Sequence, residues 1–275
     1  MSRFLIRWVS ALTLLLSTFG SHGQTIHIAH CMTACPSGSS PANEIVVRHL
    51  YAASINAETG LADWVAYRIL EDSVGVASLL RRWWQQDELL PGTAIIEEGV
   101  DRPGFTQPDL TDQPDRSYRI NEIVFSSEER GRLVPLTSFA DTPYWEELNN
   151  LTNMAPLPAD LRTGSWARLE QAINELAATE GELFVVSGPI YEISAPLSIQ
   201  ANGYSEQASA FFKVVATRSH YAAFLFDHAV SGTANYCDHR STLQQIQSRS
   251  GLTLFPDLLQ MGSPDLAARL RCNSN

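Results

Sequence analysis

Positive charge is scarce in this sequence. Its 275 residues include 30 aspartates and glutamates but only 19 lysines and arginines, and the net charge is −11 at pH 7. Lysine is almost absent, since Lys213 is the only one. A nucleic-acid binder usually has a basic balance, so any such site here would be a local basic cleft in an acidic body. Arginine suits bidentate phosphate contacts, but a bias in genome composition accounts equally for the arginine preference.

Long apolar runs are absent after residue 19. The one such run, Trp8–Phe19, follows Arg3 and Arg7 and precedes the small residues Ser21 and Gly23. This order predicts a signal peptide, residues 1–23, with cleavage near Gly23. An uncleaved anchor is the alternative, but the run is short for a membrane span. We therefore expect a mature chain of residues 24–275, folded as a single domain, secreted or periplasmic and not held in a membrane.

Cysteine is also sparse, with four residues: Cys31, Cys35, Cys237 and Cys272. An even number in an exported protein indicates two disulfides, and four cysteines allow three pairings. The local choice joins Cys31 to Cys35, and Cys237 would then bind the C-terminal tail at Cys272. A metal site is the competing interpretation, but the Cys-x3-Cys spacing has no matching second pair.

Several apolar segments predict strands, and in Ala62–Leu70 the alternation of Val65, Tyr67 and Ile69 with Ala66 and Arg68 indicates a half-buried one. Two lie early in the chain, at Asn43–Tyr51 and Ala62–Leu70, with a hairpin turn at Asn56–Gly60 between them. Three more are expected later: Glu182–Val186, which would end at the Ser187-Gly188-Pro189 turn, Ala210–Ala216 and Tyr221–Phe226. The segment from Glu71 to Asn121 shows little periodicity and predicts long loops with short helices.

Helical spacing is clearest at Ser165–Leu176, where Trp166, Leu169 and Ile173 form part of an apolar stripe. Thr163 or Ser165 would cap its start. Shorter helices are expected at Leu243–Arg249 and Pro264–Leu270. Because strands and helices are segregated, the sequence predicts an α+β fold with a largely antiparallel central sheet flanked by helices.

One stretch, Ser127–Glu170, gathers polar and charged residues between apolar anchors, as a rigid scaffold does around a site. It contains ERGRLVPLTSFA from Glu129, WEELNNLTNMAP from Trp145 and GSWARLE from Gly164. With ADWVAYR at Ala62, SGPIYE at Ser187 and HYAAFLFD at His220, it makes the chain resemble the DNA/RNA non-specific endonuclease family. These are secreted nucleases of the ββα-metal type, so the resemblance implies that fold over nearly the whole mature chain.

The resemblance implies metal-assisted phosphodiester hydrolysis, with Mg²⁺ as cofactor and DNA or RNA as substrate. In the family, the histidine of an Asp-Arg-Gly-His motif is the general base. An asparagine before the Trp-Ala-x-Leu-Glu helix is the direct protein ligand of Mg²⁺, and water fills most of its shell. The glutamate of that helix holds metal-bound water, and arginines contact phosphate and developing charge.

Four residues of this sequence match residues of the family's motifs. They are Arg130 as the motif arginine, Glu170 as the helix glutamate, Asn153 in the Asn-x-x-Pro turn and Arg82 as the upstream arginine. The resemblance implies catalytic roles for Arg130, Glu170 and Arg82. It also implies nucleic-acid contacts for Arg82, Arg130 and Asn153, and water-mediated metal contacts for Glu170 and Asn153.

Four other family positions have changed. Glu129 replaces the motif aspartate, Leu157 replaces a glutamine, Arg132 replaces the general-base histidine and Arg162 replaces the metal-ligand asparagine. Arginine offers no usable lone pair and stays protonated, so it can be neither a base nor a metal ligand. We therefore expect a catalytically impaired or inactive form, in which Arg132 and Arg162 bind nucleic-acid phosphates and Mg²⁺ need not be bound.

Two alternatives stay open. An active nuclease with a rearranged site would take another base, for which the chain offers His220, His228 and His239. A secreted scaffold that binds no nucleic acid would instead neutralise its arginines internally. The pairs would be Arg132 with Glu128 or Glu129, and Arg162 with Glu170 or Asp160.

Trp83 and Trp84 are adjacent in the sequence, and such a pair fits base stacking or, more simply, core packing.

Overall fold

The computed structural model describes residues 27–57, 60–82, 84–90, 118–120, 123–125, 130–192, 208–255 and 266–272. The predicted signal peptide lies outside these ranges, as do Glu128, Glu129 and Trp83, so what the sequence predicts for them stays a prediction. Among the described residues, no helix is both long enough and apolar enough to cross a membrane.

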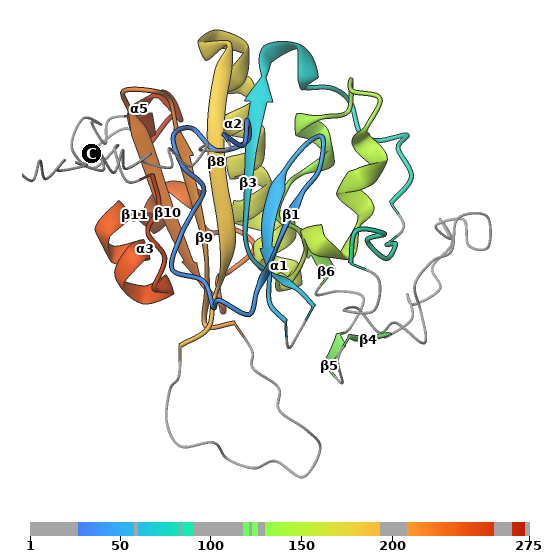
Figure 1. Cartoon of the computed structure of the whole chain (residues 1–275). Coiled ribbons are helices and arrows are strands. Elements are labelled where there is room, and N and C mark those ends of the chain that lie inside the picture. Colours follow the sequence, from blue (N-terminus) through green and yellow to red (C-terminus); the bar gives the residue numbers. More distant parts are fainter. Residues whose placement is uncertain are drawn as a thin grey trace, which may run out of the picture.

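A seven-stranded sheet forms the centre of the fold (Figure 1). Its strands lie in the order β1-β2-β3-β8-β9-β10-β11, and all neighbours are antiparallel. Their bounds are β1 Glu44–Val47, β2 Ala52–Ile55, β3 Ala62–Leu70, β8 Glu182–Ile190, β9 Ala210–Ala216, β10 Tyr221–Asp227 and β11 Arg240–Ser241. The predicted α+β class with a largely antiparallel sheet is confirmed.

Two small ladders accompany the sheet, β4 (Tyr118–Ile120) with β5 (Ile123–Phe125), and β6 (Arg130–Arg132) with β7 (Met154–Pro156). The helices described are α1 Ala159–Leu161, α2 Ala167–Glu180, α3 Leu243–Ser250 and α5 Leu266–Arg269. Short turns are η1 Glu71–Ser73, η3 Leu136–Ser138, η4 Trp145–Asn149, η5 Leu151–Asn153, η6 Arg162–Trp166 and η7 Tyr236–His239. The β6–β7 ladder and α2 supply the candidate site.

The two faces of the sheet bury separate apolar cores because side chains alternate along each strand. On one face, Tyr67, Val185 and Phe224 pack with Trp166 and Ile173 of the η6–α2 segment. On the other face, residues such as Trp64, Phe184, Phe212 and Leu243 form a second cluster, to which α3 contributes. Figure 1 shows α2 behind β3 and β8, and α3 beside β10. The candidate site lies on the α2 face.

Most predicted elements are present, with two corrections among the strands. Asn43–Tyr51 is not one strand: β1 ends at Val47, and a turn closed by Arg48 N–H to Tyr51 O (2.8 Å) leads into β2. The predicted strand end at Ser187–Pro189 is also wrong, since β8 continues to Ile190. Beyond Ser187, β8 pairs with β9 alone, which is an edge position where a proline is tolerated.

The predicted caps of the main helix are also wrong. The helical path starts earlier, at α1, and passes through the π-helical turn η6 before α2. Thr163 Oγ1 donates to Ala159 O (2.8 Å) and Ser165 Oγ donates to Ala234 O (2.6 Å), so neither hydroxyl caps α2. Gly164 lies at the kink, where an added Cβ would come within 2.5 Å of Gly232 O. Glycine therefore lets the helix start pack against the loop after β10.

Both predicted disulfides are confirmed. Cys31 is bonded to Cys35 and Cys237 to Cys272. The second bond ties the segment that carries α5 to η7, the turn that follows β10.

Candidate functional site

The β6–β7 ladder carries the altered motif. Arg130 pairs with Pro156, Gly131 with Ala155 and Arg132 with Met154. The close approach of the next segment requires glycine at position 131, because an added Cβ would lie 2.4 Å from Leu157 Cδ1. Leu157 is the residue that replaces the family glutamine, and it is buried. The ladder thus holds the backbone of Arg132 against the elements that follow it in the chain.

The Arg132 side chain is held by three groups. Its Nε donates to Leu148 O at 3.2 Å, and its Nη2 donates to Asn149 Oδ1 at 2.5 Å. Its guanidinium carbon lies 4.4 Å from the centre of the Trp84 ring, a cation–π arrangement. Asn149 is buried and in turn donates to Arg81 O. A fixed, permanently charged guanidinium therefore occupies the position that the resemblance gives to the general base.

Glu170 and Lys213 form an ion pair beneath this ladder. The Lys213 ammonium is fully buried and lies 3.1 Å from Glu170 Oε1, 3.1 Å from Tyr67 Oη and 3.3 Å from Leu133 O. It also lies 4.2 Å from the centre of the Trp166 ring. Because Leu133 follows Arg132 directly, the lysine connects β9, β3 and α2 to the segment that carries Arg132.

The protonation of this pair follows from its surroundings. Burial raises the pKa of Glu170 above its ordinary value, and the Lys213 ammonium opposes that rise. Burial alone would lower the pKa of Lys213, but the oxygens of Tyr67 and Glu170 favour the charged form, and the net shift is upward. Lys213 is therefore protonated at working pH and supplies a fixed positive charge to the carboxylate.

Asn153 has a structural position. Its side chain is completely buried, and its Oδ1 accepts from Val134 N–H at 2.8 Å. Its Nδ2 donates to Val134 O at 3.0 Å and to Leu148 O at 2.9 Å. These bonds fix the loop that leads into Leu148, the residue whose carbonyl holds Arg132. In this structure Asn153 therefore supports the site from within.

The remaining predicted arginines differ in exposure and in the contacts they make. Arg82 is exposed, and its nearest described acceptor is Ala77 O at 3.5 Å. Arg162 is half-buried at the first position of η6, and its N–H donates to Pro158 O. The backbone of Arg130 lies in β6, but its side chain lies outside the described part of the structure.

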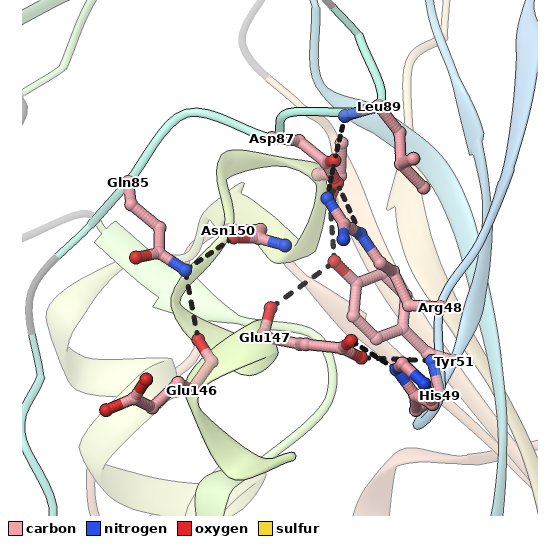
Figure 2. Close-up of polar contacts among 10 residues, drawn as sticks. Arg48, His49, Tyr51, Gln85, Asp87, Leu89, Glu146, Glu147 and Asn150 are labelled. Atoms are coloured by element: carbon pink, nitrogen blue, oxygen red, sulfur yellow. Dashed lines mark hydrogen bonds and ion pairs between the residues drawn. The ribbon is translucent and has the colours of Figure 1, made fainter.

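A buried polar network anchors the segment that carries Trp84 (Figure 2). Asp87 is 2% exposed and pairs with Arg48, and it also accepts from Thr152 Oγ1 (2.6 Å) and Leu89 N–H (2.9 Å). Tyr51 Oη lies 2.7 Å from Thr152 Oγ1. Because Trp84 is three residues from Asp87 and packs on Arg132, this network indirectly fixes the guanidinium.

Two functional arrangements were not predicted from the sequence. One is Lys213 with Glu170, although a lone lysine within the apolar strand AFFKVVA signals a specific partner.

The other is His49, whose Nδ1 lies 2.6 Å from Glu147 Oε1 and whose backbone N–H donates to Glu147 Oε2 (Figure 2). Its ring stacks on Tyr144 at 4.0 Å between centres. Sequence spacing could not show this pair because 98 residues separate its members.

The three histidines considered as replacement bases lie in other surroundings. His220 is at the β9–β10 turn, with its Nδ1 2.9 Å from Ser219 Oγ. His228 lies beside Phe211, and together with Asp160 it lines a surface hollow next to α1. His239 packs on Phe226, with ring centres 5.1 Å apart. These contacts give the three rings structural roles in the turn and the aromatic core.

The donor set at the site does not match the family's Mg²⁺ site. Among the described residues, no three His, Cys, Asp or Glu side chains form a group that could hold a metal ion. The resemblance puts Arg162, a cation that repels a metal, at the ligand position. Asn153 uses its amide inside the protein, and one carboxylate oxygen of Glu170 is bound to Lys213.

Comparison with known proteins gives consistent matches. Residues 32–261 match the family model described as DNA/RNA non-specific endonuclease. A nuclease of Serratia marcescens is 32% identical over 263 residues, covering 93% of this chain and 91% of its own length. A nuclease of Syncephalastrum racemosum is 23% identical over 255 residues, covering 84% of this chain and 73% of its own length.

The fold also has a counterpart among solved structures. A chain in the crystal structure of the EndoG/EndoGI complex superposes with a TM-score of 0.53 at 17% identity, over 77% of this chain and 85% of that chain. At this identity, the likeness speaks for the fold alone. The family match spans most of the sequence and includes the β6–β7 ladder and α2. The chain belongs to the DNA/RNA non-specific endonuclease family.

Proposed function

We propose that this protein binds the phosphates of DNA or RNA at the β6–β7 and α2 site, and that its metal-assisted hydrolysis is impaired or lost. One observation carries the proposal. Arg132 stands at the position of the general base, with its guanidinium bound to Leu148 O and Asn149 Oδ1 and packed on Trp84. An arginine cannot take a proton from water, but it is a good donor to phosphate oxygens.

The charges around the site support phosphate binding. Arg82 is exposed, and Arg132 and Arg162 are half-buried. The resemblance assigns all three to one site, where they would make a local basic surface in a chain whose net charge is −11. Such contacts recognise the sugar-phosphate backbone rather than base sequence, so DNA and RNA are both candidate ligands.

Mg²⁺ is the cofactor that the family implies, and the residues present do not suit it. A guanidinium stands at the ligand position, Asn153 is enclosed, and Glu170 already has a cation beside it. We therefore derive no catalytic step through a metal for this chain. The proposal also includes export to the periplasm or beyond, since the N-terminus has the pattern of a signal peptide.

A hydrolysis assay tests the catalytic part of the proposal. The mature protein would be incubated with duplex DNA and with single-stranded RNA, in Mg²⁺, Mn²⁺ or EDTA. We expect cleavage close to that of a protein-free control. Robust metal-dependent cleavage that disappears in Glu170→Ala would overturn the proposal.

A binding assay tests the other part. Fluorescence anisotropy with labelled oligonucleotides should show binding that weakens as salt rises, because each phosphate contact releases a counterion. Replacing Arg82 and Arg132 together by glutamine should lower both the affinity and the salt slope. Arg240→Gln, a substitution of an exposed arginine on β11, is the matched control. An absence of binding even at low salt would favour a scaffold that takes no nucleic acid.

One observation favours a second candidate, an active nuclease with a different base. Glu147 fixes the imidazole of His49 through Nδ1, the arrangement that leaves Nε2 to accept a proton. Glu147 also precedes Leu148, whose carbonyl holds Arg132. If the protein cleaves nucleic acid, loss of cleavage in His49→Ala would support this candidate, and unchanged cleavage would reject it.

A further inference from the structure

Lys213 is the only lysine in a chain that has 18 arginines, and it is among the most buried charged groups in the described structure. Its ammonium is 0% exposed and is surrounded by Tyr67 Oη, Leu133 O and Glu170 Oε1. The Trp166 ring closes a further side. The strand around it, β9, is otherwise apolar. Burying a charge is unfavourable unless other groups compensate for its lost hydration. Here the compensating groups lie on the strand β3, the helix α2 and the segment after β6.

The geometry explains why this cation is a lysine. An ammonium is compact and has three donors that can point in different directions, and three oxygens lie around it at 3.1–3.3 Å. A guanidinium is planar and larger, and it would overfill a closed site. Among the described residues the arginines all reach solvent at least in part, whereas Lys213 is fully enclosed.

We propose that Lys213 is the positioning residue of Glu170. It binds one oxygen of the carboxylate and ties the group to Leu133, the neighbour of Arg132. Glu170 is thereby held at a fixed distance from the segment that carries the motif. The proposal deepens the function proposed above and rests on it in one respect, namely that Glu170 belongs to the binding site.

A single-lysine chain allows a direct test by nuclear magnetic resonance. Protein labelled with ¹⁵N,¹³C-lysine, made without a lysine in any tag, should give one side-chain ammonium signal. Because Lys213 is enclosed, its protons should exchange slowly with water at neutral pH. Glu170→Gln removes the carboxylate charge at nearly constant shape and should shift the signal and speed up exchange. Glu175→Gln alters an exposed glutamate on the same helix and should leave the signal unchanged.

The same ammonium signal would also be followed while a duplex oligonucleotide is added to the wild-type protein. If Lys213 positions a group of the binding site, the signal should move as the site fills, whereas a lysine with a purely structural role would not respond. A fast-exchanging signal, a signal that ignores Glu170→Gln, or one that stays still at saturating oligonucleotide would overturn the inference.

Kinetics provide a second readout in a variant whose base and ligand are restored, Arg132→His with Arg162→Asn. In this background, Lys213→Met should lower kcat about 10- to 100-fold, the usual effect of losing an outer-shell partner. KM should change less than about threefold, because the loss concerns the reacting groups rather than substrate binding. Unchanged kcat per folded molecule would reject the inference.

The two proposals fail in different ways. If the restored variant does not cleave, the catalytic part of the proposed function is at fault, and the lysine signal still decides the role of Lys213. If Lys213→Met does not fold, the lysine signal of the wild-type protein and of Glu170→Gln still decides the role of Lys213.

Discussion

At the scale of single residues, the site contrasts two kinds of cation. Arg132 is half-buried and uses its planar head to bridge Leu148, Asn149 and Trp84. Lys213 is enclosed and uses a point charge to hold Glu170. The resemblance puts Arg132 where a general base is expected, and Lys213 supports the carboxylate of Glu170, which the resemblance also assigns to the site. We therefore propose that the chemistry differs at the first position while the carboxylate is still held in place.

Glycine at position 131 gives a prediction at this scale. Gly131→Ala would place a Cβ 2.4 Å from Leu157 Cδ1, and relief of that overlap should cost about 1–3 kcal/mol of unfolding free energy. Urea denaturation measures the loss. Gly131→Ala should cost less in a Leu157→Ala background than in the wild type, because the overlaps with Cδ1 and Cγ are gone and only the one with Leu157 Cβ, at 2.7 Å, remains. A fully stable single variant would contradict the packing described.

His30 gives a prediction about pH. Its Nε2 lies 2.8 Å from Arg48 O, and burial lowers its pKa below the ordinary 6.5. The unfolded chain therefore binds a proton more readily than the folded chain, so stability from this group should fall as the pH drops below 6.5. Melting temperatures from pH 7.5 to pH 5 would show the trend. Its slope should be smaller in His30→Gln, and an equal slope in both proteins would argue against the assignment.

At the scale of elements, a buried polar network holds the loop that carries Trp84. Asp87 joins Arg48, at the end of β1, to Thr152 in η5 (Figure 2). The network therefore connects the sheet edge, the 84–90 loop and the turns beside Arg132. Such a connection keeps loops in place around a site that has few regular elements.

Removal of Asp87 should therefore act beyond its own position. Asp87→Ala leaves the Arg48 guanidinium without its buried partner, and we expect a loss of about 3–5 kcal/mol in unfolding free energy. Oligonucleotide affinity should fall as well, because Trp84 and Arg132 lose their support. Glu88→Ala changes the exposed neighbour and is the control. Equal stability of the two variants would show that the network is not required.

Strands rich in apolar residues were predictable from the sequence. β3 and β9 have the predicted bounds, and both are buried on two faces because each side of the sheet packs against an apolar cluster. Asn43–Tyr51 was predicted as one strand because its apolar residues continue through the turn at Arg48. Pro189 resembled a turn signal, although it lies where β8 has one neighbour only.

The site residues that belong to a sequence motif were predictable, whereas the contacts between residues far apart in the sequence were not. Arg132 and Arg162 could be recognised from their places in the sequence. The pairing of Lys213 with Glu170 joins residues 43 positions apart on a strand and a helix, which no local pattern reveals. The enclosure of Asn153 likewise follows from the packing of Leu148 and Val134 around it.

At the scale of the whole molecule, two apolar cores and two disulfides stabilise one sheet. The Cys237–Cys272 bond joins residues 35 positions apart and fixes the C-terminal segment, whereas Cys31–Cys35 closes a loop of four. Active and inactive members of a family can share such a scaffold because function is carried by a few side chains placed on it.

The two disulfides should differ in their effect on stability. Loss of chain entropy predicts about 3–4 kcal/mol for Cys237→Ser with Cys272→Ser, and about 2 kcal/mol for Cys31→Ser with Cys35→Ser. Thermal unfolding of both variants against the oxidised wild-type protein would measure the order. A larger loss from the short loop would show that local contacts outweigh the closing of the long loop.

We propose that two arginines stand where the family's catalytic groups are expected, on an otherwise intact nuclease framework. The most direct measurement is the initial rate of duplex cleavage in Mg²⁺ by the wild-type protein and by Arg132→His with Arg162→Asn, at equal amounts of folded protein. The account predicts background cleavage by the wild type and a rate at least about 100-fold higher in the double variant, since a positioned base contributes about 10²–10⁴-fold. Wild-type cleavage that equals or exceeds that of the double variant and requires Glu170 would contradict it.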